Sequence, residues 1–214
     1  QRENLQTLNV HRDSQVYKKY KYRVAGLAPL KKTGAVIKSQ TSNLPIKIQG
    51  SKIPLPIKYQ SPVSSAQVKS SILLAGLSSL GKTTIIEPSL SRDHTERMLK
   101  FFGANISTHQ LDDMSWEITL DGIPELNPLN LSIPADPSSA AFPIVSAIIT
   151  PNSKIKVENV CINELRTGLY KTLIEMGANI HFSNQRKING ELVADISASS
   201  SKLKGITVPK TRAS

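Results

Sequence analysis

Two short stretches of the sequence hold the side chains best suited to bind an anion. Ser64-Ser65-Ala66-Gln67 places hydroxyl and backbone N–H groups at the start of a predicted helix, where the helix dipole favours negative charge. The stretch Ser91–Arg97, SRDHTER, adds Arg92, whose guanidinium can hold a phosphate or carboxylate through paired hydrogen bonds. If the two helices lie side by side, their starts converge. Both stretches are also explained, without a ligand, as ordinary helix caps.

One stretch of the sequence has the residue pattern of a phosphate-binding loop, but the elements predicted around it are in the wrong order. Gly76–Thr83, GLSSLGKT, satisfies the pattern G-x-x-x-x-G-K-[ST]. A nucleotide-binding loop of this kind follows a strand and opens a helix, so that backbone N–H groups cradle the phosphates. Here a helix is predicted before the motif and a strand after it. We therefore interpret the motif as a helix-to-strand turn.

Residues that bind metals are few and scattered along the sequence. Cys161 is the single cysteine, and its expected role is that of a small buried apolar residue. One cysteine leaves no internal disulfide and no cysteine-based zinc site, and it fits a reducing cytoplasm. The histidines are His11, His94, His109 and His181. The sequence therefore predicts no metal site, and no Ser-His-Asp triad stands out.

The charge balance favours anionic partners. Lys and Arg number 27 against 16 Asp and Glu, which gives a net charge of +11. The densest basic run, Tyr17–Arg23, alternates aromatic and cationic side chains, a mixture that nucleic-acid-binding proteins use. A basic nucleic-acid-binding module is therefore an alternative of a different class. No apolar stretch approaches the ~20 residues of a membrane span, and the first residues lack the apolar core of a signal peptide.

An internal repeat organises the chain. Residue n of a first copy, Ser64–Ile106, aligns with residue n + 74 of a second copy, Ser138–Ile180, without a gap. Both copies end in Gly-Ala-Asn-Ile, and apolar character matches at many other positions. A partial third copy lies upstream at Leu30–Ile37, LKKTGAVI. Such a long period with a preserved pattern indicates repeated supersecondary units.

Each complete copy is predicted to form a βαβαββ unit. In the first copy the serine pair caps one helix, and Ser91 is the predicted N-cap of a second helix that ends at Gly103. β-branched runs predict the strands. The predicted elements are strand 53–60, helix 64–77, strand 83–88, helix 91–104 and strands 105–110 and 115–122, with strand 129–136 opening the second copy.

The two copies differ where a ligand would be bound. The second copy keeps Arg166 at the position of Arg92, but it has Ala141 at the position of Gln67. It also replaces His94 by a glycine. The fold therefore does not require Gln67 or His94, which favours a functional role for these side chains.

Several segments together resemble the EPSP synthase family, the 3-phosphoshikimate 1-carboxyvinyltransferases. They are PVSSAQVKSSILLAGL, IIEPSLSRDHTERMLKFFGA, IPADPSSAAFPIVSAII and NELRTGLYKTLIEMGANI. The resemblance runs from about Pro29 to Pro209. It implies an α/β fold of repeated βαβαββ units, the inside-out α/β barrel, here incomplete. UDP-N-acetylglucosamine enolpyruvyl transferase shares this architecture but does not typically carry the SAQ and SRDHTERM segments, so it is a weaker alternative.

The family resemblance implies an activity and a set of ligands. Such an enzyme moves the carboxyvinyl group of phosphoenolpyruvate to the 5-hydroxyl of shikimate 3-phosphate, in the cytoplasmic shikimate pathway to chorismate and aromatic amino acids, without metal or cofactor. By position, Ser65, Ala66, Gln67 and Arg92 bind shikimate 3-phosphate. Gln67 also lies near phosphoenolpyruvate, for which the choice of a further cation between Lys21 and Arg23 is open, with Arg23 preferred.

The resemblance also implies a domain division and an incomplete chain. Residues 1–28 form an unmatched basic arm, 29–134 belong to the first domain, and 135–214 begin the second. Family chains are roughly twice as long. The acidic catalytic base is expected beyond the last residue, and no catalytic residue is identified within the sequence. We therefore expect little or no activity from the chain alone, as for a decayed gene product, unless separately encoded segments complement it.

Overall fold

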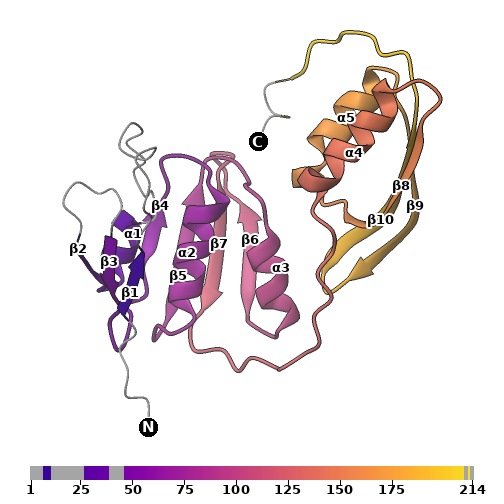
Figure 1. Cartoon of the computed structure of the whole chain (residues 1–214). Helices are drawn as coiled ribbons and strands as arrows, with labels where there is room; N and C mark the ends of the chain where they lie inside the picture. The colour runs from indigo at the N-terminus through magenta and orange to yellow at the C-terminus, as the bar shows by residue number, and fades with distance from the viewer. Residues whose placement is uncertain (1–6, 11–26, 39–45, 210–211, 213–214) are drawn as a thin grey trace. The chain divides into compact units, whose positions relative to one another are not determined.

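The computed structural model describes residues 7–10, 27–38, 46–209 and 212. The chain forms two compact units (Figure 1). Unit 1 contains the residues up to Leu90 together with Gly103–Asn127, and unit 2 contains Ser91–Phe102 and Pro128–Ser214. The predicted domain division between residues 134 and 135 remains a prediction. Among the described residues, no helix has the length and apolar character needed to cross a membrane.

The main sheet of unit 1 is the predicted βαβαββ unit without its second helix, which the contacts assign to unit 2. Its strand order is β4-β5-β7-β6, with β4 and β5 parallel and the other neighbours antiparallel. Helix α2 connects β4 to β5 and contacts β5 and β7. The elements are β4 (Lys58–Gln60), α2 (Ala66–Gly76), β5 (Lys82–Glu87), β6 (Ile106–Gln110) and β7 (Trp116–Asp121).

A smaller antiparallel sheet holds the partial third copy. Its order is β1-β3-β2, from β1 (Thr7–Val10), β2 (Val36–Lys38) and β3 (Ile46–Gln49). Helix α1 (Leu27–Lys32) precedes β2, and between them Gly34 adopts φ +93°. Gly103 and Gly177 occupy the same helix-to-strand position of the other copies with φ +97° and +96°, a conformation that glycine adopts without steric cost. The repeat is therefore conserved down to the backbone angle of its turn.

Unit 2 contains the second copy. Its antiparallel sheet has the order β8-β10-β9, and the main-chain bridge of Ala135 to Val160 of β8 is parallel. This order corresponds strand by strand to that of unit 1, with Ala135 in the place of β4. The elements are α3 (His94–Phe101), α4 (Pro137–Ile149), β8 (Lys154–Cys161), the 3-10 turn η2 (Glu164–Arg166), α5 (Gly168–Glu175), β9 (Asn179–Ile188) and β10 (Glu191–Ser199).

The predicted strand 129–136 was wrong. Its alternating Leu129, Leu131 and Ile133 are all exposed, and only the isolated bridge at Ala135 joins a sheet. Pro134 has no N–H to donate to a ladder. The Ser132 N–H donates instead to the Asn189 side chain at 2.9 Å. Period-2 alternation indicates a strand only where a neighbouring strand accepts its hydrogen bonds.

Of the two N-caps predicted from the sequence, one is confirmed and one was wrong. Ser65 is the N-cap of α2, as predicted. The structure also shows Asp136 as the cap of α4, where it accepts from the Ser139 N–H at 2.8 Å, and the sequence had not indicated this role. The predicted N-cap Ser91 was wrong, because α3 begins at His94 with Asp93 before it. Asp93 makes no capping hydrogen bond, since its carboxylate binds Asn163 and Arg97.

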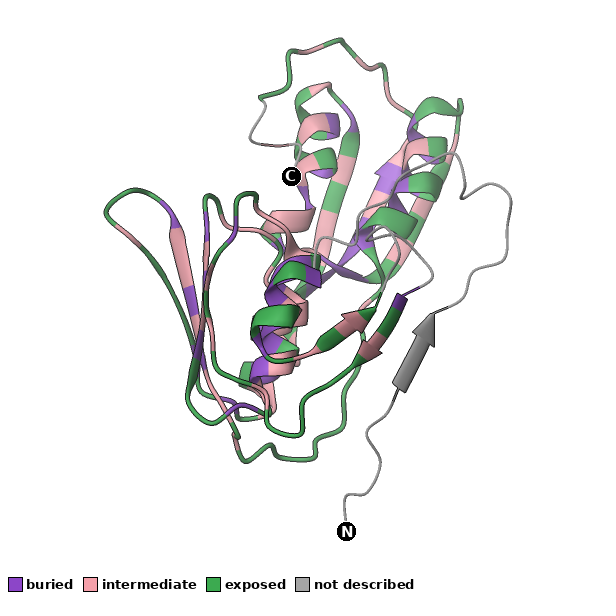
Figure 2. Cartoon of the chain, turned by 90° about the vertical axis from the view of Figure 1, so that its left-hand side faces the viewer, coloured by how far each residue is buried: buried purple, intermediate pink, exposed green. Residues whose placement is uncertain are grey.

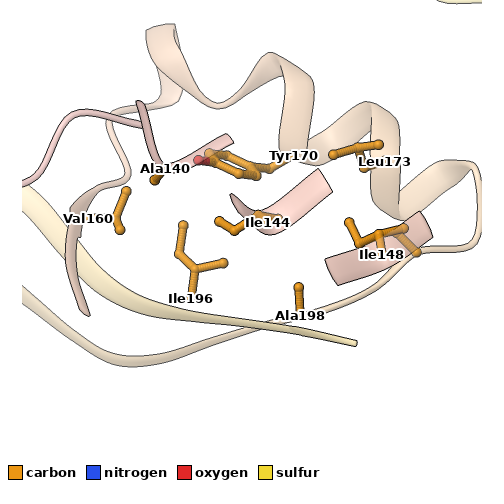
Figure 3. Packing of buried hydrophobic residues seen from close by; sticks show 9 residues of the cluster. Ala140, Ile144, Ile148, Val160, Tyr170, Leu173, Ile196 and Ala198 are labelled. Atoms are coloured by element: carbon orange, nitrogen blue, oxygen red, sulfur yellow. The ribbon is translucent and has the colours of Figure 1, made fainter. Parts of the chain in front are cut away.

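The hydrophobic core of unit 2 lies between its two helices α4 and α5 and its sheet. Figure 3 shows Ile144 and Ile148 of α4 close to Ile196 and Ala198 of β10. Tyr170 of α5 is 1% exposed and donates its hydroxyl to the Pro137 carbonyl at 2.7 Å. In Figure 2 the helices show buried positions along one side and exposed positions along the other, as amphipathic periodicity predicts.

Candidate functional site

The start of α2 presents the predicted hydroxyl and amide groups of unit 1. Ser65 adopts an extended conformation, and its Oγ accepts from the Val68 N–H at 3.4 Å. The preceding Ser64 donates its hydroxyl to the Ser89 carbonyl at 2.6 Å and accepts from the Ser89 N–H at 3.0 Å. Ser64 therefore fixes the helix start to the loop after β5, while the Ser65 O–H remains a donor for a ligand.

Gln67 points its functional group outward from the first turn of α2. It is exposed, and its side chain makes no hydrogen bond within the described part of the chain. The N–H groups of Ala66 and Gln67 lie in the first turn, where no helix carbonyl four residues earlier is present to accept their hydrogen bonds. Hydroxyl, amide and two backbone N–H groups at the positive end of a helix suit an anionic, polyhydroxylated ligand.

The loop that carries the nucleotide-like motif is a packed turn, as predicted. It lies between α2 and β5, so the strand-loop-helix order of a P-loop is reversed. The Ser79 hydroxyl donates to the Gly76 carbonyl at 2.8 Å, and the Gly81 carbonyl accepts from the Gly122 N–H at 2.9 Å. Lys82 lies 3.6 Å from Asp121. The polar groups of the loop therefore bind within unit 1 rather than surround a phosphate.

Arg92 lies in unit 2 at a basic cavity of about 650 Å³. The cavity is also lined by Ser138 at the start of α4 and by Gly168 at the start of α5. Its charged lining consists of Arg92, Glu164, Arg166, Lys171 and Arg212. Arg92 and Lys171 are exposed and make no ion pair with described residues, so they are the cations available to a ligand.

The other two arginines of this cavity are held by carboxylates. Arg166 donates to Asp136 Oδ1 at 2.6 Å and to the Ser138 hydroxyl at 2.9 Å. Arg212 makes a bidentate pair with Glu175 at 2.6 and 2.9 Å. These pairs lower the electrostatic field of the cavity without removing its basic character, and they hold both guanidinium groups in fixed positions.

The backbone and side chains around Asp136 fix its charge. The Ser139 N–H contributes most to holding the pKa of Asp136 below its ordinary value. Burial acts in the opposite direction, and the Ser139 hydroxyl and Arg166 add to the lowering. Asp136 is therefore ionised near neutral pH. It both caps α4 and orients Arg166.

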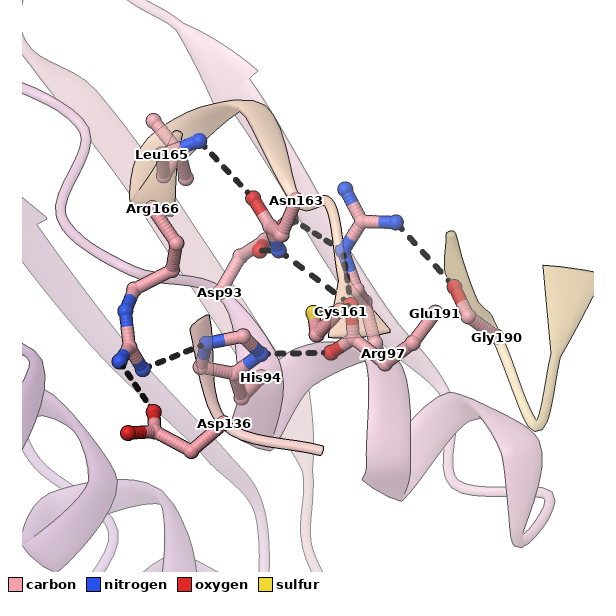
Figure 4. A network of polar contacts seen from close by, with 10 residues as sticks. All are labelled: Asp93, His94, Arg97, Asp136, Cys161, Asn163, Leu165, Arg166, Gly190 and Glu191. Carbon is pink, nitrogen blue, oxygen red and sulfur yellow. Dashed lines mark hydrogen bonds and ion pairs between the residues drawn. The ribbon is translucent and has the colours of Figure 1, made fainter. Parts of the chain in front are cut away.

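A polar network joins α3 to the rest of unit 2 (Figure 4). Asp93 accepts from Asn163 at 2.6 Å and from Arg97 at 2.7 Å, and Arg97 also donates to the Gly190 carbonyl at 3.1 Å. His94 Nδ1 lies 2.7 Å from Glu191 Oε1. The SRDHTER stretch is therefore divided: Arg92 faces a cavity, whereas Asp93, His94 and Arg97 attach the helix to its own unit.

Burial and charge act in opposite directions on the two acids of this network. Burial raises the pKa of the Cys161 thiol, so the sulfur is protonated near neutral pH. Burial would also raise the pKa of Glu191, but the hydrogen bond and charge of His94, together with Arg97 and Asn163, hold it below its ordinary value. Glu191 is therefore a carboxylate and Cys161 a neutral thiol.

The predicted site residues are distributed over both units. Ser65, Ala66 and Gln67 lie together in unit 1, and Arg92 lies in unit 2, so their convergence remains a prediction. Arg23, its alternative Lys21 and the whole basic run Tyr17–Arg23 lie outside the described residues. The cavity residues Lys171 and Arg212 were missed, because nothing in their sequence neighbourhood distinguishes them from solvated cations.

Comparison with known proteins gives one consistent family. The model of the family described as EPSP synthase (3-phosphoshikimate 1-carboxyvinyltransferase) matches residues 25–212. A 3-phosphoshikimate 1-carboxyvinyltransferase of Bartonella quintana is 51% identical over 188 residues, which is 87% of this chain and 42% of the relative. That of Parvibaculum lavamentivorans is 50% identical with the same coverage. The chain thus spans less than half the length of the curated relatives it matches.

Solved structures agree with this result. The EPSP synthase from Acinetobacter baumannii superposes with a TM-score of 0.74 at 41% identity, covering 88% of this chain and 42% of that one. The enolpyruvyl transferase NikO from Streptomyces tendae superposes with a TM-score of 0.61 at 14% identity, covering 85% and 42% of the two chains, and shares the fold alone. The predicted architecture of repeated units is confirmed, and the sheets of the described residues remain open.

Proposed function

Because the chain belongs to the EPSP synthase family, we propose that it carries part of the shikimate 3-phosphate site of a carboxyvinyltransferase. The start of α2 is the observation that carries this proposal. Ser65, Ala66 and Gln67 offer a hydroxyl, a side-chain amide and backbone N–H groups at the positive end of a helix. Shikimate 3-phosphate has the hydroxyl, carboxylate and phosphate groups that such donors recognise.

Arg92 supplies the charge in this proposal. It borders the basic cavity of unit 2 with no ion-pair partner among the described residues. A guanidinium group binds phosphate or carboxylate through two parallel hydrogen bonds, each strengthened by the charge. We assign Arg92 to shikimate 3-phosphate and Gln67 to both substrates, and Arg23 remains our preferred further ligand of phosphoenolpyruvate.

The reaction that these groups serve is an addition followed by an elimination. The 5-hydroxyl of shikimate 3-phosphate loses its proton as its oxygen bonds to C2 of phosphoenolpyruvate, and C3 gains a proton, which gives a tetrahedral intermediate. Loss of one proton from the resulting C3 methyl group and of inorganic phosphate then restores the double bond as the enol ether product. Both substrates are anions, so binding depends on fixed positive charge, in agreement with the net charge of +11.

Titration calorimetry with shikimate 3-phosphate tests the proposal directly. We expect saturable binding that weakens when Gln67→Ala removes the exposed amide. Gln49→Ala, an exposed glutamine of β3, is the matched control and is expected to bind as the parent does. Absence of binding to the folded chain would refute the proposal.

The same titration separates the alternatives. Preference for UDP-N-acetylglucosamine over shikimate 3-phosphate would favour the sister transferase, to which the named relatives give no support. Binding of duplex or single-stranded DNA that weakens steeply with salt would favour the basic module. The cytoplasmic location and the separately encoded complementing segments stay predictions.

A further inference from the structure

Three residues that are far apart in the sequence bring metal-ligating atoms together in unit 2. His94 lies at the start of α3, Cys161 at the end of β8 and Glu191 at the start of β10. A histidine nitrogen, the cysteine sulfur and a carboxylate oxygen all lie within 4.8 Å of one another. Figure 4 shows the three side chains directed toward one point. Glu191 contacts both neighbours, with Oε1 2.7 Å from His94 Nδ1 and Oε2 3.8 Å from Cys161 Sγ.

The charges around the cluster leave a negative excess at its centre. Two arginines lie close by, with Arg97 Nε 3.8 Å from Glu191 and Arg166 Nη1 3.5 Å from His94. Each has a nearer carboxylate: Asp93 at 2.7 Å for Arg97 and Asp136 at 2.6 Å for Arg166. When His94 is neutral, as metal binding requires, the three carboxylates of Asp93, Asp136 and Glu191 face two guanidinium groups, so one negative charge is in excess and an ionised thiol would add a second. A divalent cation balances both.

The donor set matches zinc rather than calcium or magnesium. Zn²⁺ binds thiolate, imidazole and carboxylate ligands in a tetrahedral arrangement, whereas the harder cations prefer oxygen ligands alone. Cys161 is 5% exposed and Glu191 has a side chain 12% exposed, so bulk water competes weakly for these ligands. An adjoining cavity of about 340 Å³, bordered by Met98 and Leu131, has room for a water molecule as a fourth ligand.

Asn163 supplies the outer support that such a centre needs. It is 1% exposed, and its amide donates to Glu191 Oε2 at 3.4 Å and to Asp93 Oδ1 at 2.6 Å. Partners of this kind orient a ligating carboxylate and strengthen metal binding. In the metal-free structure His94 Nδ1 donates to Glu191 Oε1 at 2.7 Å, so metal binding at Nδ1 replaces this hydrogen bond and moves the ring proton to Nε2.

We propose that His94, Cys161 and Glu191 form a zinc-binding site with a water molecule as the fourth ligand. On binding, the thiol proton leaves to solvent and the sulfur binds the metal as thiolate. The metal ties the start of α3 to β8 and to the start of β10. Bound zinc therefore stabilises unit 2 through ligands that the unfolded chain does not assemble.

Cobalt substitution tests the sulfur ligand directly. Titration of the metal-free 214-residue chain with Co²⁺ is expected to produce the near-ultraviolet band of thiolate-to-cobalt charge transfer, which Zn²⁺ then removes by displacement. Cys161→Ser is expected to abolish the band. His94→Gln and Glu191→Gln, which keep the thiol, are each expected to weaken Zn²⁺ binding more than Asn163→Ala, for which loss of outer support costs about 10–100-fold.

The matched control is a second histidine–carboxylate pair that has no thiol. His109 Nε2 lies 3.3 Å from Glu117 in unit 1, and His109→Gln is expected to leave the band and the Zn²⁺ affinity unchanged. Circular dichroism verifies the fold of every variant. If Cys161→Ser does not fold, the Zn²⁺ affinity of His94→Gln provides the test instead. Absence of the cobalt band in the parent chain, or Zn²⁺ affinity unaffected by all three ligand variants, would overturn the proposal. Neither result bears on shikimate 3-phosphate binding, which is measured separately.

Discussion

At the scale of single residues, Arg92 is the most direct test of the substrate assignment. We expect Arg92→Ala to weaken shikimate 3-phosphate binding about tenfold or more, because a charge-assisted hydrogen bond contributes about 1.5–3 kcal/mol. Calorimetry at fixed ionic strength measures the change. Lys100→Ala removes another exposed cation, from the last turn of the helix α3 that follows Arg92, and is the control. Equal weakening by both variants would mean that only the overall charge matters.

Asp136 links a single ionisation to the stability of unit 2. Its pKa is lowered in the folded chain, chiefly by the Ser139 N–H, so the carboxylate contributes stability at every pH above its unfolded pKa of about 3.9. That contribution is lost as the pH falls through the lower folded pKa. Asp136→Ala is therefore expected to reduce the free energy of unfolding by about 0.5–2 kcal/mol at pH 7 and to flatten its acid dependence.

Urea unfolding at several pH values measures both effects of the Asp136 substitution. Asp112→Ala, in the turn after β6, serves as the control, because the tip of that turn is exposed and caps no helix. An unchanged acid limb in Asp136→Ala would show that other carboxylates determine the pH dependence.

At the scale of elements, a buried ion pair holds α2 against β5. Lys69 Nζ lies 3.0 Å from Glu87 Oε1, and both side chains are 1% exposed. Lys69→Met is expected to lower the free energy of unfolding by about 3–5 kcal/mol, because it removes a hydrogen-bonded cation from beside a buried carboxylate. The double variant Lys69→Met/Glu87→Leu is expected to recover most of this loss, since well-packed apolar residues replace such pairs at little cost.

Urea unfolding of the two variants and of Glu87→Leu forms a double-mutant cycle. The surface pair Lys58–Glu117, 3.3 Å apart with the lysine 68% exposed, is the matched control, and Lys58→Met is expected to cost less than about 1 kcal/mol. Additive losses in the cycle would contradict a coupled pair. The result also bears on the proposed shikimate 3-phosphate site, because Lys69 lies one helical turn after Ser65.

At the scale of the whole molecule, we expect the chain to bind a substrate without catalysing the reaction efficiently. The chain covers 42% of the length of its curated relatives. We expect the 214-residue polypeptide to bind shikimate 3-phosphate but to release little phosphate from phosphoenolpyruvate, because transition-state stabilisation needs charged and acid–base groups placed together. A colorimetric phosphate assay with both substrates checks this, with a full-length relative as the control. Comparable release by the two proteins would show that these residues suffice.

Much of the fold could be predicted from the sequence because the informative patterns are local. Helical periodicity, β-branched runs and the glycine that closes each helix repeat at a fixed spacing, and each acts within a few residues. The repeat placed α2, β5, β6 and β7 within one or two residues of their bounds. The order of the predicted elements also identified the P-loop-like sequence Gly76–Thr83 as a helix-to-strand turn. The prediction of a strand at 129–136 was wrong because the alternation of apolar and polar residues does not reveal whether a partner strand is present.

The tertiary structure decided how distant side chains are used. The sequence determined the family, the repeated unit and Ser65 as a helix cap, because short-range hydrogen bonding and periodicity encode them. It gave no sign that Cys161 meets His94 and Glu191, and it predicted no metal ligands. That meeting depends on the register of β8 and β9 against β10 and on hydrogen bonds that attach α3 to unit 2. Register depends on how whole faces pack together, which no short stretch of sequence can specify.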